Sequence, residues 1–260
     1  MDELRADCAR CAGLCCVALP FSRSSDFAVD KPAGVPCANL GHDFTCSIHS
    51  RLRPAGFTGC TVFECFGAGQ RVVQQLYGGR TWRGDPALAA AMFDAFARVR
   101  ALHELSYYLR EASSWPAAQP LTAELVAARA TTDALAAQAR EPVPLDAHRA
   151  AVAPLLRRAS ELVRRPAGVD HSGRQLVGAD LRRSELRRGD LRNALLLGAD
   201  LRGLDLDRTD LLGADLRGAD VRGADLRQAL YVTQPQLDAA VGDATTRVPA
   251  RLDRPAHWSG

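Results

Sequence analysis

A period of five residues governs the chain from about residue 174 to residue 231. Leucine or valine occupies every fifth position, at Leu176, Leu181, Leu186, Leu191, Leu196, Leu201, Leu206, Leu211, Leu216, Val221 and Leu226. An α-helix repeats about every 3.6 residues and a strand about every 2, so neither accounts for the spacing. A square coil with four five-residue sides does, because each side then directs one leucine inward. The segment is therefore predicted to stack on itself as a coil.

A second periodic position supports this prediction. A small residue stands two places before most of the leucines, at Ala179, Ser184, Gly189, Ala194, Ala199, Thr209, Ala214, Ala219 and Ala224. A narrow coil has room for one large and one small side chain on each side. Arg174 and Leu204 break the small-residue rule, which predicts an irregular entry coil at Arg174 and a bulged side at Leu204.

The repeated unit resembles that of the pentapeptide repeat family. The family pattern Ala-Asp-Leu-x-x occurs unaltered where Ala179, Ala199, Ala214 and Ala224 begin it. The resemblance covers residues 174–231 and implies a right-handed quadrilateral β-helix. The carboxy-terminal part of the molecule, residues 166–231, is expected to have that fold.

A stacked coil has open ends, which need a cover to prevent edge-to-edge association. The helix expected just before residue 166 is placed to cover the start. At the other end, Thr233 and Gln236 have the spacing of a capping box, which predicts a short helix ending near Gly242. The tail of residues 232–260 is then expected to fold back, with His257 and Trp258 as a packing lid.

The amino-terminal quarter has a different composition, because every cysteine of the chain lies there. They are Cys8, Cys11, Cys15, Cys16, Cys37, Cys46, Cys60 and Cys65. Spacings of two to four residues let two thiolates reach one metal ion, and such cysteines in a reducing compartment are more often metal ligands than disulfides. Residues 1–84 are therefore predicted to be a metal or iron-sulfur module.

Spacing alone does not choose the metal. Eight thiols suit two four-thiolate zinc sites, one four-cysteine iron-sulfur cluster with spare thiols, or a mixture. If Cys15 and Cys16 are extended, their side chains point to opposite faces and serve different positions. The excess of thiols over a single zinc site favours an iron-sulfur cluster of the 4Fe-4S type over zinc. The Gly67-Ala68-Gly69-Gln70 run is interpreted as a tight turn leaving the site.

The cysteine pattern resembles the zinc- or iron-chelating cysteine-cluster family. The resemblance covers residues 8–66 and rests on Cys8-x2-Cys11-x3-Cys15-Cys16, the run from Lys31 to Cys37, Cys46-x-Ile48-His49, Arg53-Pro54 and Cys60-x4-Cys65. The flagellin lysine N-methylases carry a related pattern. The resemblance implies a metal or iron-sulfur site and leaves its chemistry open.

Residues 85–165 are predicted to form a helical segment. Asp85-Pro86 is typical of an N-cap and first turn. Apolar residues then recur with helical spacing at Leu88, Met92, Phe96, Val99, Leu102, Leu105 and Leu109. A second helix is expected after Pro120 and a third after Pro144, with Pro154 kinking it or marking its start.

Charge and composition exclude some functions. The net charge is only +3, and residues 171–230 contain 11 arginines and 10 acidic residues, so the coil cannot present the charge of a duplex. No stretch reaches the length of a membrane span, and the amino terminus has no secretory pattern, so a cytoplasmic protein is expected. Neither a membrane nor nucleic acid is an expected partner.

Three functions then remain to be compared. The first is a cytoplasmic metal-binding protein, redox or accessory, whose β-helix face docks a protein partner or a second copy of the chain. The second is an iron-sulfur-dependent enzyme with a methylase-like, protein-modifying activity. The third, a topoisomerase-binding DNA mimic, is disfavoured by the balanced charge and by a coil of fewer than three turns. The sequence does not decide whether the protein is an enzyme, and it indicates no catalytic residue.

Overall fold

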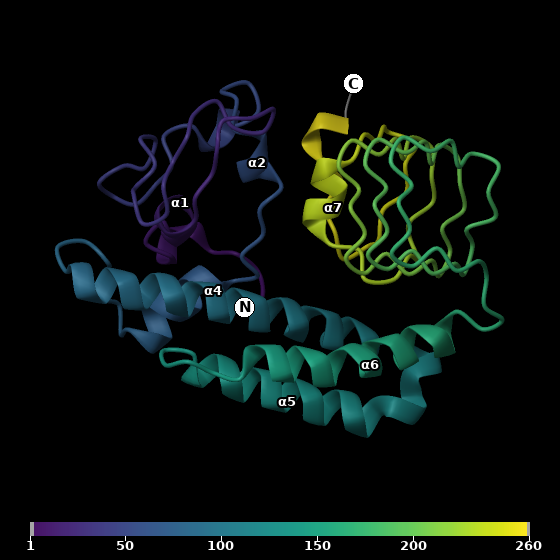
Figure 1. The fold of residues 1–260 in the computed structure, drawn as a ribbon, viewed down its shortest axis with the longest axis horizontal. Coiled ribbons are helices and arrows are strands. Elements are labelled where there is room, and N and C mark those ends of the chain that lie inside the picture. Colours follow the sequence, from purple (N-terminus) through teal and green to yellow (C-terminus); the bar gives the residue numbers. More distant parts are fainter. Residues whose placement is uncertain (1–2, 259–260) are drawn as a thin grey trace. The chain divides into compact units, whose positions relative to one another are not determined.

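The computed structural model describes residues 3–258, which divide into two compact units. Residues 3–114 and 121–156 form one unit, and residues 115–120 and 157–258 form the other. In chain order the helical elements are η1 (Cys8–Arg10), α1 (Leu14–Ala18), η2 (His49–Arg51), α2 (Thr58–Thr61), α3 (Ala68–Gln70), η3 (Arg71–Leu76), α4 (Pro86–Ser113), η4 (Pro116–Leu121), α5 (Thr122–Gln138), α6 (Leu145–Val163), α7 (Gln234–Ala239) and η5 (Ala256–Trp258) (Figure 1).

The coil of the second unit advances by four five-residue sides per turn. Parallel bridges join residues that are twenty apart, such as Asp170 with Asp190 and Asp180 with Asp200. Each bridge is isolated, and within residues 3–258 no continuous strand forms. A side of five residues contains a corner turn, which leaves room for one bridging residue only. The predicted square coil is confirmed, and its ladder is built of single bridges.

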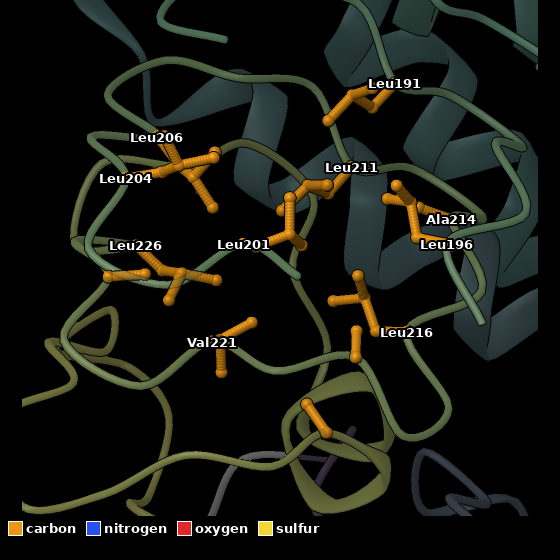
Figure 2. Close-up of a cluster of buried hydrophobic side chains, with 14 of the residues drawn as sticks. Leu191, Leu196, Leu201, Leu204, Leu206, Leu211, Ala214, Leu216, Val221 and Leu226 are labelled. Atoms are coloured by element: carbon orange, nitrogen blue, oxygen red, sulfur yellow. The ribbon is translucent and has the colours of Figure 1, made fainter. Parts of the chain in front are cut away.

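The periodic leucines fill the interior of this coil (Figure 2). Leu191, Leu196, Leu201 and Leu211 are wholly buried, together with small residues such as Ala199. Several corners use a left-handed residue two places after the leucine. Glycine is common there, with φ of 64° at Gly198 and 69° at Gly203, because it adopts this conformation without steric strain.

Two expected irregularities are absent from the backbone. The main chain at Arg174 joins the ladder, since its carbonyl accepts a hydrogen bond from the Leu195 amide at 2.9 Å, although its side chain is exposed. Leu204 is buried in the core, and the bridge between Asp205 and Asp225 continues beside it. The interior therefore accepts a second large side chain at Leu204 without loss of register.

The end of α6 covers a side of the coil, whereas the sequence predicted a cover over its start. Ser160 donates a hydrogen bond to Asp210 at 2.5 Å, and the Arg164 guanidinium pairs with Asp190 at 3.1 Å. Asp190 and Asp210 lie on successive turns of one side. Arg192 pairs with both carboxylates, so the buried polar groups of this side satisfy one another. The helix itself runs unbroken through Pro154.

The carboxy-terminal cover agrees with the prediction. The capping box of Thr233 and Gln236 opens α7, and the tail adds further bridges to the coil at Val241 and Arg247. Trp258 is 1% exposed and its indole N–H donates to the Ala240 carbonyl at 3.1 Å. A Cβ on Gly242 would lie 2.4 Å from this ring, so only glycine fits beneath the lid.

One hydrophobic core joins the cysteine module to the long helix α4 in the first unit. Leu14 and Val17 of α1 belong to the same cluster as Met92, Phe96 and Val99 of α4. Asp85 caps α4 as predicted, accepting a hydrogen bond from the Leu88 amide at 3.0 Å. The helix α5 packs against α4 and contributes Ala136 to the same core.

Candidate metal centre

All eight predicted ligands are free thiols in the first unit. Cys11 is buried, Cys8 is exposed, and the other six are partly buried. Within residues 3–258, no three His, Cys, Asp or Glu side chains converge closely enough to chelate an ion. A cysteine has a single side-chain torsion with three staggered positions, so a change of rotamer moves the sulfur while the backbone stays in place. The arrangement of the backbone around the thiols is therefore the test of whether they fit a metal.

Cys15 and Cys16 are helical, so the extended arrangement considered from the sequence is wrong. Both lie in α1, whose N-cap Gly13 is left-handed with φ of 62°. Their sulfurs are 3.8 Å apart and share a hydrogen bond. That hydrogen bond and burial raise the pKa of Cys15, whereas the same hydrogen bond lowers the pKa of Cys16. Cys16 is therefore the thiol of the pair that ionises more readily.

The segment that carries Cys8 and Cys11 is fastened to the segment that carries Cys65. Gln70 accepts a hydrogen bond from the Asp7 amide at 2.9 Å and donates to the Arg5 carbonyl at 2.7 Å. Gln74 donates to the Arg10 carbonyl at 3.0 Å. These amide side chains hold residues 5–10 against α3 and η3.

Glycine makes the approach of these segments possible. A Cβ on Gly69 would lie 2.6 Å from the Cβ of Cys11 and 3.6 Å from its sulfur. Gly67 is left-handed with φ of 74° and caps α3, so the run predicted as a tight turn is a turn only at Gly67 and is helical from Ala68 to Gln70. The turn brings its amides to the sulfur of Cys65, where the N–H groups of Gly69 and Gly67 donate hydrogen bonds that lower the pKa against a larger rise from burial.

Backbone amides also point at two other sulfurs. The N–H groups of Gly13 and Leu14 donate to Cys11 and help the hydrogen bond from Cys8 to lower its pKa against burial. At Cys46 the Ile48 amide does the same, although burial raises that pKa overall. Donors placed two to four residues after a cysteine stabilise its anionic form, which is the form that binds a metal. The donor set therefore fits a thiophilic metal in its chemistry.

Cys16, Cys37 and Cys46 are brought together by main-chain hydrogen bonds. The Cys37 amide donates to the Cys16 carbonyl at 2.9 Å, and the Leu40 amide donates to the Cys37 carbonyl at 2.9 Å. Leu40 and Cys46 form an antiparallel bridge. Burial and the charges of Cys16, Cys37 and Cys46 raise the pKa of Cys60 to about 11, so the charge of any of these sulfurs acts on Cys60.

Lys31 is a buried cation beside these thiols. Its side chain is the only lysine of the chain and its residue is 5% exposed. The ammonium donates to the carbonyls of Val17, Pro32 and Val35 at 3.1, 3.1 and 2.9 Å, and it lies 5.5 Å from the centre of the Phe21 ring. Carbonyls satisfy its hydrogen bonds but leave its charge unpaired. Sequence alone gives Lys31 no role, and its position as the sole lysine of the chain, within the cysteine motif, is the signal that could have indicated one.

The surface of the coil is the predicted docking face. Asp180, Asp200 and Asp220 each pair with the arginine two residues later, and the arginines of the first two also reach the next turn, at 3.3 Å and 3.6 Å. Positive and negative charges therefore alternate along this side. A different side exposes apolar residues: Val177 is 57% exposed, Leu195 41% and Leu197 37%.

No helix within residues 3–258 combines the length and apolar character needed to cross a lipid bilayer.

Comparisons with known proteins identify relatives of both the whole chain and its coil. The family model described as pentapeptide repeats matches residues 175–211 and 194–230. An uncharacterised protein of Bacillus subtilis strain 168, YybG, is 53% identical over 266 residues, a match that covers 98% of this chain and 95% of that protein. The crystal structure of a pentapeptide repeat protein from the Arabidopsis thaliana thylakoid lumen is 30% identical, with a TM-score of 0.17, over 32% of this chain and 57% of that one.

Proposed function

The chain belongs to the same family as Bacillus subtilis YybG and contains pentapeptide repeats, and from this premise we propose that it is a metal-binding protein whose eight cysteines hold an iron-sulfur cluster or zinc. The repeat is the scaffold of this protein, in the right-handed form that its resemblance to the family implies. The cysteine motif, which resembles that of the zinc- or iron-chelating cysteine-cluster family, supplies the ligands.

The observation that carries this proposal is the placement of backbone amides around three sulfurs. Backbone N–H groups of residues two to four places further along the chain lower the pKa of Cys11, Cys46 and Cys65, although burial raises the pKa of Cys46 and Cys65 overall. A buried structural thiol needs no such donors, since a neutral S–H is a small apolar group. The ligand spacing of the eight free cysteines supplies the rest of the argument.

The metal would supply two things to this module. Coordinated thiolates link loops that contain little regular structure, so metal binding contributes to folding. An iron-sulfur cluster would add reversible one-electron chemistry, with a potential set by hydrogen bonds to the sulfurs and by burial. Iron-sulfur binding is favoured over zinc because of the number of thiols.

Anaerobic purification of the full chain tests the proposal. Iron, zinc and acid-labile sulfide should be determined together with the visible spectrum. A brown protein that absorbs broadly, and loses absorbance when Cys11, Cys15 or Cys60 is replaced by serine, is expected. A colourless protein with about two zinc ions would assign zinc instead. Protein that contains neither metal under these conditions would overturn the proposal.

We also propose that the coil docks a protein partner through its apolar side. Val177 and Leu197 lie twenty residues apart, so they stack on successive turns beside Leu195, and exposed apolar groups of this kind favour association. Sedimentation of wild type and of the Leu195→Ser/Leu197→Ser variant tests whether a second copy is the partner. A concentration-dependent dimer in the wild type that is lost in the variant identifies a homodimer. A wild-type monomer at all concentrations excludes it.

A further inference from the structure

A cleft with a volume of about 440 Å³ lies in the first unit, apart from the cysteine loops. Its walls are the carboxy-terminal end of η3, the amino-terminal half of α4 and the connection between α5 and α6. Among the described residues that line it there is no cysteine. The volume falls within the range of small-molecule sites, about 300 to 1,000 Å³. The cleft is therefore large enough for a small ligand of its own.

Two arginines of the cleft carry charges that no carboxylate offsets. Arg98 fastens the connection between α5 and α6 onto α4, because its Nε and Nη2 donate to the carbonyls of Ala139 and Arg140 at 2.9 and 3.0 Å. The Arg140 guanidinium lies over the Tyr77 ring, 5.0 Å from its centre. Carbonyls and an aromatic ring are neutral partners. Both guanidinium charges therefore remain available to an anion in the cleft.

The Tyr77 hydroxyl is a third group that can bind an anion there. The Tyr77 residue is 5% exposed and its ring packs in the core. Its hydroxyl oxygen is buried, and within residues 3–258 it makes no hydrogen bond of ordinary geometry. Burial raises the pKa of Tyr77 against the charges of Arg140 and Arg98, so the hydroxyl keeps its proton at neutral pH. A buried hydroxyl without a partner is costly, and an oxyanion in the cleft would accept its hydrogen bond.

The carboxylates of the cleft indicate what else the ligand carries. Arginines and carboxylates are equal in number among the lining residues. Their one ion pair, among the described residues, joins Arg80 with Asp85 at 3.6 Å. Asp94 is left without such a pair, and it lies one helical turn before Arg98 on the same face of α4. Its charge repels a bare anion and attracts a cationic group, so a ligand with charges of both signs fits this lining.

We propose that the cleft binds a small zwitterion. Arg98, Arg140 and the Tyr77 hydroxyl hold its acid group. Asp94 holds its amine. The planar fork of arginine matches a carboxylate and a phosphate equally well, so the acid group belongs either to an amino acid or to a phosphorylated amine. This site goes beyond the proposed metal binding and does not depend on it.

Calorimetric titration of the full chain with three probes tests the site. β-Alanine and phosphoethanolamine each carry an amine two carbons from the acid group, which is a carboxylate in the first and a phosphate ester in the second. Inorganic phosphate has no amine. At least one zwitterion should bind more tightly than inorganic phosphate, and the tighter of the two identifies the acid group. If neither zwitterion binds at several millimolar, or if inorganic phosphate binds as tightly as both, the proposal is overturned.

Variants of the cleft assign the roles of its residues. Tyr77→Phe keeps the ring and should lower the affinity for the zwitterion by about 10-fold, because a hydrogen bond to a charged group is lost. Arg140→Met should lower it at least as much. Asp94→Asn should weaken binding of the zwitterion and leave that of inorganic phosphate no weaker. Arg129→Met is the control, since Arg129 pairs with Asp133 at 3.7 Å outside the cleft, and it should bind as the wild type does.

Thermal melting of each variant shows whether it folds. Tyr77→Phe removes one oxygen only and keeps the test open if Arg140→Met fails to fold. Wild-type affinity in a folded Tyr77→Phe protein would contradict the assigned hydroxyl. Equal losses for the zwitterion and for inorganic phosphate in Asp94→Asn would contradict the assigned amine site.

Discussion

The coil and the cysteine module hold their chains together in opposite ways. In the coil the same contact recurs every twenty residues, from the bridge of Asp170 with Asp190 to that of Asp205 with Asp225. In the module each loop is fastened by a contact that occurs once, such as Gln70 with the Asp7 amide or Trp82 with the Ala12 carbonyl at 2.8 Å. A repeated contact tolerates local exceptions such as Leu204, whereas a contact made once has no neighbour to replace it. The two regions should therefore respond differently to damage.

The largest effect is expected from a charge in the interior of the coil. Leu201→Asp places a carboxylate at a wholly buried position within the apolar core of the coil. An unpaired buried charge costs several kcal/mol, about as much as the whole stability of a small domain. We expect the coil to unfold, as measured by circular dichroism and thermal melting.

Leu197→Asp is the matched control for this change. The substitution is chemically identical and lies on the same turn, but the Leu197 side chain is 37% exposed. Its melting temperature should stay close to that of the wild type. If the Leu201→Asp protein instead unfolded cooperatively at the melting temperature of the wild type, the leucine register described above would be wrong.

Removal of metal should destabilise the cysteine module and leave the coil folded. If the thiols hold metal, a strong chelator under reducing conditions should release the loops of residues 8–66, since metal binding contributes folding free energy there. Amide hydrogen exchange should then increase in those residues while the ladder amides of Leu191 and Leu196 remain protected. Loss of protection in both regions would show that the coil depends on the module for its stability.

The sequence predicted the recurring contacts and the local signals correctly, and it missed the contacts that occur only once. The leucine period of five residues follows directly from a twenty-residue turn with four sides, and the capping box of Thr233 and Gln236 is a local signal. Both features could therefore be predicted from the sequence. The place of α6 depended on Ser160 and Arg164 meeting Asp210 and Asp190, and no period connects a helix with carboxylates fifty and twenty-six residues away. The helical state of Cys15 and Cys16 follows from the left-handed Gly13 and the packing of Leu14 and Val17, which the cysteine spacing does not encode.

The buried carboxyl of Asp210 gives the coil a pH response of its own. Burial raises its pKa from 3.8 to about 6, and the hydrogen bonds from Ser160 and the Leu212 amide, with the charge of Arg192, only partly offset this rise. The folded state therefore binds the proton more tightly than the unfolded chain. The contribution of Asp210 to stability falls as the pH rises from about 4 to about 6.

Asp210→Asn removes this titration and keeps an oxygen that can accept from Ser160. Relative to wild type, the variant should gain up to about 3 kcal/mol in free energy of unfolding between pH 4 and pH 7. Asp215→Asn is the control of opposite sign: Arg217 lowers the Asp215 pKa, so the wild-type carboxylate stabilises the coil above pH 4 and loses that effect in acid. Denaturant titrations at several pH values measure both. A parallel pH dependence of Asp210→Asn and wild type would contradict the assignment.

The smallest effect is expected from the ion pairs on the outer surface of the coil. Arg202 pairs with Asp200 at 2.6 Å and with Asp220 at 3.6 Å, but its side chain is 42% exposed, so water and salt screen both contacts. Arg202→Ala should cost less than about 1 kcal/mol in free energy of unfolding, and the loss should shrink as salt is added.

Arg192 has the same place in its repeat and pairs with Asp190 and Asp210, yet its side chain is only 10% exposed. Arg192→Ala leaves buried carboxylates with one cation fewer and should cost about 3 kcal/mol, with little dependence on salt. Equal losses for the two variants would mean that burial by α6 adds nothing to these ion pairs, and that the surface ladder stabilises the coil as strongly as the buried cluster.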